Sequence, residues 1–148
     1  MPTLLEKLPL PDKRPAILDD CVKLLDSEVA RRKGMSGLAV KAGYKVLKSI
    51  KPGATREAMD GLLDDFIQAL EPFHEKYQES GPKGSFGAFL KKRTAEVAEA
   101  LVQITDRKAE KSKHKNLVRG YKKLRQTAIK SVKDAVPGLA ELLDKYYA

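Results

Sequence analysis

The stretch that decides the fold is TREAMDGLLDDFIQAL, residues 55–70. Its apolar side chains recur at the i, i+3, i+4, i+7 spacing that places them on one face of an α-helix. They are Met59, Leu62, Leu63, Phe66, Ile67 and Leu70. The pattern predicts an amphipathic helix that begins near Thr55. Because Pro72 removes one backbone hydrogen bond, we expect this helix to kink or split there.

Two helices are expected before this stretch. Asp12 is suited to cap the first helix, with Pro15 in its first turn, and Gly34 is suited to end it. Ser36 is suited to cap the second, whose sequence GLAVKAGYKVLKSI ends at Pro52-Gly53. The small residues in that sequence would let another helix approach closely. We therefore expect the second helix to lie at the centre of the fold.

The second half of the chain continues the helical pattern. The glycine-rich stretch ESGPKGSFG predicts a loop, and Ser85 is suited to cap a fourth helix that runs past Ile104. A weak break at 111–115 leads to a fifth helix, which Val136-Pro137-Gly138 should end before a short final helix. With no strand-like alternation anywhere, residues 1–148 are predicted to form a single all-α domain: a bundle of about five main helices with short terminal helices.

Positive charge is concentrated in one segment. The chain carries a net charge of +9, and residues 107–133 alone contain eleven lysines and arginines against one glutamate. The rest of the chain is therefore close to neutral. Such asymmetry bears on the choice of partner rather than on the fold.

Several features set the expected location. The single cysteine, Cys21, cannot form an internal disulfide. The first residues, MPTLLEKLPLPDKRP, interrupt their apolar run with charges and prolines and do not resemble a signal peptide. No apolar run reaches the roughly 18 residues that a bilayer-spanning helix needs. We expect a cytoplasmic protein.

Several motifs together resemble a known family. They are SGLAVKAGYKVLKSIKPG, LEPFHEKYQESG followed by FGAFL, ITDRKAEKS, and VRGYKKLRQTAIKSV with AVPGL. Over nearly its whole length the chain is similar to a family of small bacterial proteins that is catalogued as a domain of unknown function. The resemblance implies a self-contained all-helical bacterial domain. Its motifs are helix seams and turns, and they supply no catalytic or binding residue.

Residues suited to catalysis or to metal binding are few. His74 follows Pro72, and we expect it on a helix surface; His114 lies among lysines. Two separated histidines and one cysteine do not provide the three or four ligands that zinc needs. Cys21 stands next to acidic residues, which raise the pKa of a thiol, so we expect it to be a core residue rather than a nucleophile.

The remaining motifs give no stronger sign of chemistry. Asp60 and Asp64 share a helix face that we expect to be solvated, and the adjacent pairs Asp19-Asp20 and Asp64-Asp65 point about 100° apart on a helix. The loop GPKGSFG has the glycines, lysine and helix N-terminus of a phosphate cradle. It lacks the spacing and the preceding strand of a nucleotide-binding loop, so we expect a flexible connection. The sequence predicts no catalytic residues, no metal site, no cofactor and no enzymatic role.

The fifth helix has two distinct faces. Leu117, Tyr121, Leu124, Ala128 and Val132 fall within a sector of about 80°, at 100° per residue. The opposite side of this helix, within residues 113–133, is basic, and Arg125 lies at the boundary. The basic residues are Lys115, Arg119, Lys122, Lys123, Lys130 and Lys133.

Three functions are consistent with this basic face. The first is binding to the phosphates of nucleic acid without base specificity, because no helix-turn-helix, zinc finger or RNA-binding motif is present. The second is docking to an acidic protein surface, which positive charge would steer. The third, which we expect least, is contact with an anionic membrane surface, for which Lys41, Lys45 and Lys48 offer a second basic face. Nothing in the sequence sets an oligomeric state.

Overall fold

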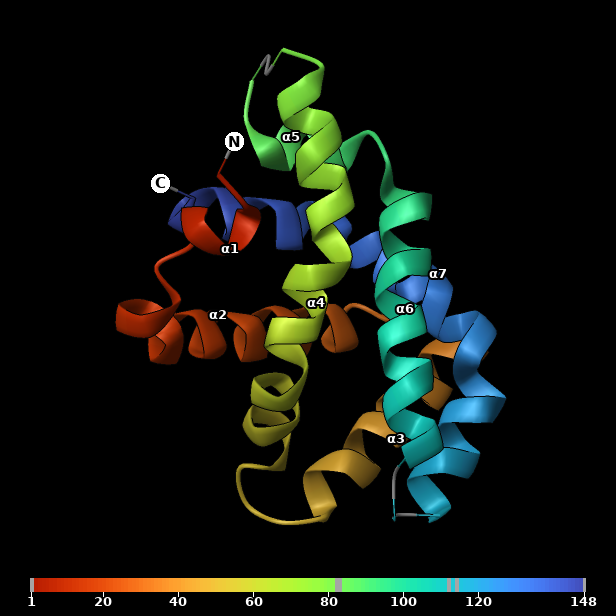
Figure 1. Cartoon of the computed structure of the whole chain (residues 1–148). Coiled ribbons are helices and arrows are strands. Elements are labelled where there is room, and N and C mark those ends of the chain that lie inside the picture. Colours follow the sequence, from red (N-terminus) through yellow and green to blue (C-terminus); the bar gives the residue numbers. More distant parts are fainter. Residues whose placement is uncertain (1, 82–83, 112, 114, 148) are drawn as a thin grey trace.

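The protein is a bundle of α-helices (Figure 1). The computed structural model describes residues 2–81, 84–111, 113 and 115–147, without the side chains of residues 35, 36, 117, 123 and 124. Five helices are long: α2 (Leu10–Ala30), α3 (Gly34–Ser49), α4 (Ala54–Glu79), α6 (Thr94–Lys111) and α7 (Lys115–Tyr146). Two are short: α1 (Leu4–Lys7) and α5 (Phe86–Lys91). The described residues contain no β-strand, and the predicted all-α bundle of five main helices is confirmed.

The apolar stripe of α4 forms the middle of the core. Leu63, Ile67 and Leu70 are at most 8% exposed. α4 packs on α2 and on α6, and Figure 1 shows it crossing α2 and running beside α6. Its side chains join apolar residues from every helix except α3 in one buried cluster. The stretch that predicted the fold therefore supplies the middle of the core, and α1, α2, α3, α5 and α6 pack against its helix.

The first long helix begins earlier than predicted. α2 starts at Leu10, with Pro9 as its N-cap residue and no side-chain cap. Asp12 is therefore in the first turn and does not cap the helix, and Pro15 lies inside it. The predicted cap was wrong because prolines at the first helical positions already fix the backbone torsion that a helix start requires.

The second long helix is peripheral rather than central. α3 starts at Gly34, two residues before the predicted cap at Ser36, and Ser36 is part of the helix with its side chain outside the description. Among its described residues only Gly37 is buried, while Leu38 and Val46 are exposed. A methyl group at Gly37 would lie 2.7 Å from the carbonyl carbon of Arg32. The small residue therefore makes room for the turn between α2 and α3 instead of for another helix.

Two prolines lie inside continuous helices, contrary to prediction. α4 is not split at Pro72, and α7 continues through Pro137 to Tyr146, so the predicted short final helix is part of α7. A proline inside a helix costs about 3 kcal/mol. Both prolines are exposed, whereas Phe73 and Val136 beside them are buried. Burial of apolar residues on both sides of each proline holds the helix together.

The predicted fourth helix is instead two helices. Ser85 caps α5 as expected, because its Oγ accepts a hydrogen bond from the Ala88 N–H at 3.0 Å. The helix stops at Lys91, however, and α6 begins at Thr94. The predicted break between the fourth and fifth helices is confirmed, since α6 ends at Lys111 and α7 begins at Lys115.

The start of α5 is held by a carboxylate from α7. Asp144 accepts hydrogen bonds from the Gly87 N–H and the Ser85 hydroxyl, both at 2.8 Å. Gly87 lies so close to α7 that a methyl group on it would be 2.6 Å from the carbonyl oxygen of Ala140. The two helices can approach this closely only with a glycine at that position.

We expect Gly87→Ala to lower the free energy of unfolding by about 1–3 kcal/mol, because the added methyl group would force α5 away from α7. The measurement is urea unfolding followed by circular dichroism. Gly61→Ala is the matched control, since a methyl group there meets no atom within 4 Å. It should stabilise the protein by about 1 kcal/mol through helix propensity alone. Equal effects of the two substitutions would contradict the close contact of α5 with α7.

Candidate nucleic-acid interface

The predicted basic face lies on the outer side of α7. Lys115, Arg119, Lys122, Lys130 and Lys133 are all exposed, and the side chain of Lys123 lies outside the described residues. On the inner side, Tyr121, Ala128 and Val132 are partly buried, while the side chains of Leu117 and Leu124 are also outside the description. The predicted division into a packed and a solvent-facing side holds for the described residues.

A polar cluster fixes α7 against α6. Arg125 donates two hydrogen bonds from Nε and Nη2 to Asp106, the shortest at 2.8 Å, and the Tyr121 hydroxyl donates to Asp106 at 2.6 Å. The same hydroxyl is 2.6 Å from the Thr105 hydroxyl. Hydrogen bonds from Arg125 and Tyr121 lower the pKa of Asp106. Burial, and then the hydrogen bond to Asp106, raises the pKa of Tyr121 to about 12.

This cluster decides which groups on the hairpin of α6 and α7 stay free. Arg125 binds Asp106 and lies 3.9 Å from Glu99, so it is a structural cation. Tyr121 is partly buried and its hydroxyl is bound to Asp106, so its ring is not a freely exposed face for base stacking. The cluster therefore fixes the orientation of α7 and of its outer side chains. Its own residues are not part of the basic surface.

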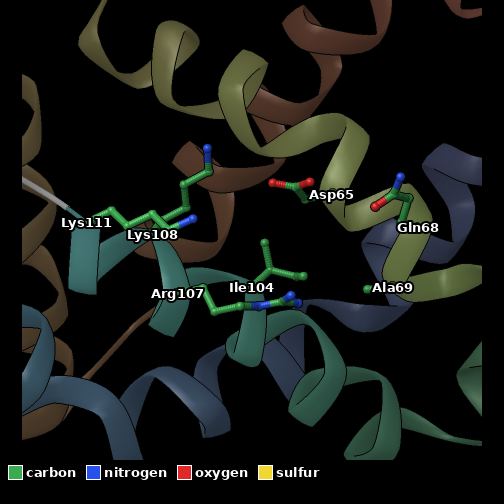
Figure 2. A pocket seen from close by; sticks show the side chains of 7 residues that line it. All are labelled: Asp65, Gln68, Ala69, Ile104, Arg107, Lys108 and Lys111. Atoms are coloured by element: carbon green, nitrogen blue, oxygen red, sulfur yellow. The ribbon is translucent and has the colours of Figure 1, made fainter.

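Three further cations extend the basic face onto α6. Arg107, Lys108 and Lys111 are exposed and line a cavity of about 330 Å³ between α6 and α4. Figure 2 shows Lys108 and Lys111 on one side of this cavity, with Asp65 and Gln68 of α4 opposite them. The site residues predicted from the fifth helix did not include these three cations. Their spacing at i, i+1 and i+4 could have indicated them, because it places them on one side of the preceding helix.

We define the basic hairpin as the seven exposed cations that surround the end of α6 and the start of α7. They are Arg107, Lys108, Lys111, Lys113, Lys115, Arg119 and Lys122. One glutamate, Glu110, lies among them in sequence. The hairpin forms the lower right edge of the molecule in Figure 1, away from both chain ends.

The cations of the basic hairpin are close together in sequence and have no partner carboxylate among the described residues. In the part of the chain that the structure describes, none of the seven forms an ion pair. Several arginines elsewhere are paired, for example Arg14 with Asp60 and Asp64, and Arg56 with Asp19. The positive charge predicted from composition is therefore left uncompensated at one end of the bundle.

Two cations near the other end of α6 have partners. Lys91 lies 3.6 Å from Glu141, and the Arg93 guanidinium lies 3.7 Å from the centre of the Phe89 ring. α6 has 18 residues. At 1.5 Å per residue its two ends are roughly 27 Å apart. The basic hairpin thus lies roughly the length of α6 away from these two partnered cations.

His74 is buried, so its predicted place on a helix surface was wrong. Its side chain is 0% exposed and packs against Phe86 and Tyr147. Nε2 forms a hydrogen bond with the Tyr147 hydroxyl at 2.8 Å, and Nδ1 has no hydrogen-bond partner. The oxygen of Glu71 lies 3.9 Å from Nδ1. Because α4 continues through Pro72, it turns position 74 toward α5 and the C-terminal end of α7.

Burial is the main influence on the charge of His74. It lowers the pKa of His74 and outweighs the nearby carboxylates of Glu71 and Glu75, which raise it. His74 is therefore held in its neutral form. None of the three cavities described for this fold is lined by His74. His114 lies outside the described residues.

The other candidates have structural roles. Cys21 is a core residue as predicted, and burial, followed by the charge of Asp20, raises the pKa of its thiol to about 11. Asp60 and Asp64 do share a face, and both bind Arg14 across to α2. Among the described residues, no three histidine, cysteine or carboxylate side chains are grouped to hold a metal ion.

The glycine-rich loop does not present a free helix N-terminus. The first backbone donors of α5 are bound by Asp144 and Ser85, which occupy the place that a phosphate would take. Pro82 and Lys83 of this loop lie outside the described residues. The arrangement agrees with a connection that ends in a serine cap.

Comparison with known proteins identifies the family. The chain belongs to a family of unknown function (DUF6918), whose model matches residues 4–147. No curated protein and no solved structure matches the chain. No helix in the described part combines the length and the apolar character needed to cross a bilayer.

Acidification below neutral pH is expected to destabilise the protein through His74. Because burial lowers its pKa in the folded chain, the unfolded chain, with a pKa of about 6.5, takes up the proton first. The contribution of neutral His74 to the free energy of unfolding is fully present above about pH 6.5. It decreases as the pH falls below that value, by at most about 1.4 kcal/mol per pH unit. The measurement is the free energy of unfolding in urea between pH 7 and pH 5.

Two variants separate this effect from other titrations. His74→Phe should abolish most of the pH dependence in this range, because hydrogen bonds from Lys145 and from Arg125 hold the pKa of Asp20 and of Asp106 below the ordinary range of an aspartate. His114→Gln removes the other histidine and should leave the dependence unchanged. A dependence that persists in His74→Phe and disappears in His114→Gln would show that the wrong histidine has been assigned.

Proposed function

We propose that this chain, as a member of a family of unknown function, is a non-enzymatic helical module that binds the phosphate backbone of nucleic acid without reading its sequence. The binding surface is the basic hairpin, continued along α7 by Lys130 and Lys133. Nucleic acid as the partner fits the cytoplasmic location expected from the sequence. The observation that supports the proposal is that the exposed cations of the hairpin have no carboxylate partner in the described structure.

Unpaired cations on one ridge favour a polyanion. Each lysine or arginine that neutralises a phosphate releases a condensed counterion, and the gain is largest where no protein carboxylate must first be displaced. From Lys115 to Lys133 α7 rises by roughly 27 Å, at 1.5 Å per residue. An extended backbone with regularly spaced phosphates can contact such a ridge at several points at once.

The composition of the surface argues against base recognition. Base-specific contacts are made by side chains that a recognition motif inserts into a groove, and single-strand binding uses exposed aromatic rings. No such motif is recognisable in the sequence, and the nearby aromatic Tyr121 is bound to Asp106 and partly buried. We therefore expect duplex DNA or RNA to bind through phosphates alone.

Docking to an acidic protein is the alternative for the same cations. A stable protein interface usually has an apolar centre. Of the large apolar residues among those described, only Leu5, Leu38 and Val46 are exposed, and none of them belongs to the basic hairpin. The hairpin thus offers charge without an apolar centre, which favours the nucleic-acid partner.

Binding of a labelled 30-base-pair duplex should weaken steeply with salt. Fluorescence anisotropy at several salt concentrations should give a slope of log affinity against log salt of roughly −4 to −6, because about five to six phosphates are contacted at once. Absence of binding at 50 mM salt, about the low end of the usual range, would rule the proposal out. The acidic protein surface would then be the partner to test.

Charge reversal distinguishes the hairpin from the net charge of the protein. Lys111→Glu, Lys115→Glu and Lys122→Glu combined should reduce the affinity at least tenfold and flatten the slope by about three. The matched control combines Lys13→Glu, Lys76→Glu and Lys92→Glu, which lie outside the hairpin, are exposed and form no ion pair among those described. It makes the same change in net charge and should retain most of the affinity. Equal losses in the two variants would contradict a localised surface.

A further inference from the structure

A large apolar cavity extends from the surface of the bundle into its core. Its volume is about 330 Å³, and its walls come mainly from α2, α4, α6 and α7, for example Cys21, Phe66, Leu101 and Leu139. Native interiors normally contain few voids larger than a water molecule. An apolar cavity of about 150 Å³ is already large enough to bind benzene and stays free of water. The core of this protein therefore has space for an apolar group about twice that size.

A second cavity adjoins the first on the side of the basic hairpin. It has a volume of about 400 Å³ and lies between α3, α4, α6 and the start of α7. The two cavities share Leu47, Ala58, Leu62 and Thr105 in their walls, so they are direct neighbours. Most of the residues that line the second cavity are also apolar.

Among the described residues, Lys108 is the one cation in the wall of this second cavity. The other polar groups there are engaged: the Thr105 hydroxyl donates to the Val102 carbonyl at 2.8 Å, and the Tyr121 hydroxyl donates to Asp106. Lys108 forms no ion pair among those of the described residues. A charged head group at this point would therefore have a free ammonium group to bind.

Lys108 also lines the polar cavity beside it (Figure 2). Arg107 and Lys111 add positive potential to that cavity, and Asp65 faces them from α4. The surroundings thus favour an anion, while the carboxylate of Asp65 opposes a second negative charge. From the core outward, the order is an apolar space, a second apolar space and a cationic rim.

We propose that this series of cavities binds an anionic amphiphile with a single negative charge: a straight-chain carboxylate with its alkyl chain in the core cavity and its head group at Lys108. By comparison with the cavity that holds the six carbons of benzene, the core cavity accommodates about ten to twelve carbon atoms. Ligand sites are typically apolar and have a few placed polar groups, as here. This site does not depend on nucleic-acid binding.

Decanoate below its micelle concentration is the probe, measured by isothermal titration and by the shift in melting temperature. Decanoate should bind and raise the melting temperature, since a ligand that binds only the folded state stabilises it. Decyltrimethylammonium has the same alkyl chain and a positive head group. It should bind at least tenfold more weakly. Absence of decanoate binding, or equal binding of both probes, would overturn the proposal.

Variants of neighbouring lysines test the position of the head group. Lys108→Gln should weaken decanoate binding at least tenfold. Lys111→Gln is the matched control, because Lys111 lines the polar cavity but not the second apolar one. It should change the affinity less than twofold. Equal losses would mean that decanoate responds only to the general positive potential, and the proposed site would be wrong.

A cavity-filling variant tests the position of the alkyl chain. Ala58 lines both apolar cavities. Ala58→Leu should raise the melting temperature of the ligand-free protein and abolish decanoate binding, whereas enlarging a residue in a filled core lowers stability. A lower melting temperature with unchanged decanoate binding would show that the alkyl chain does not enter this space.

The charge-reversal variant separates the two proposals. Lys111→Glu, Lys115→Glu and Lys122→Glu leave Lys108 in place, so this variant should still bind decanoate whatever its affinity for the duplex.

Discussion

The continuity of α7 across Pro137 is the constraint on which the rest of the structure depends. Val136 and Ala140, on either side of this proline, are 0% exposed. Burying apolar side chains on both sides outweighs the backbone hydrogen bond that the proline removes. As one helix, α7 packs against α2, α3, α5 and α6. In Figure 1 its first half lies beside α6 and its second half runs toward α5 and the chain ends.

The two halves of α7 use their charges differently. In the second half, charged side chains bind other helices: Asp134 to Arg32, Asp144 to the start of α5, and Lys145 to Asp20. In the first half, Arg125 binds Asp106 on α6, and the exposed lysines before it have no ion-pair partner in the described structure. One end of the helix therefore organises the bundle, and the other end keeps the free positive charge on which nucleic-acid binding would depend.

The same region connects the two proposed ligands. Lys108 belongs to the basic hairpin and also lines the apolar cavity that adjoins the core. The polar cluster of Asp106 and Tyr121 lies between these features and holds α6 against α7. A molecule in the cavity and a polyanion on the surface would thus contact the same short part of α6. Both proposed sites therefore include residues at the end of α6 next to α7.

The sequence by itself determined the helical class, the core stripe of α4, the cap at Ser85, the break after Lys111 and the exposed side of α7. These features follow from the spacing of apolar residues and from local capping, which neighbouring residues decide. Only the tertiary structure decided that Pro137 lies inside a helix, that His74 is buried and that Lys108 lines an apolar cavity. Each of these depends on the packing of helices that are far apart in the sequence. Burial and ion pairing are set by neighbours in space rather than by neighbours along the chain.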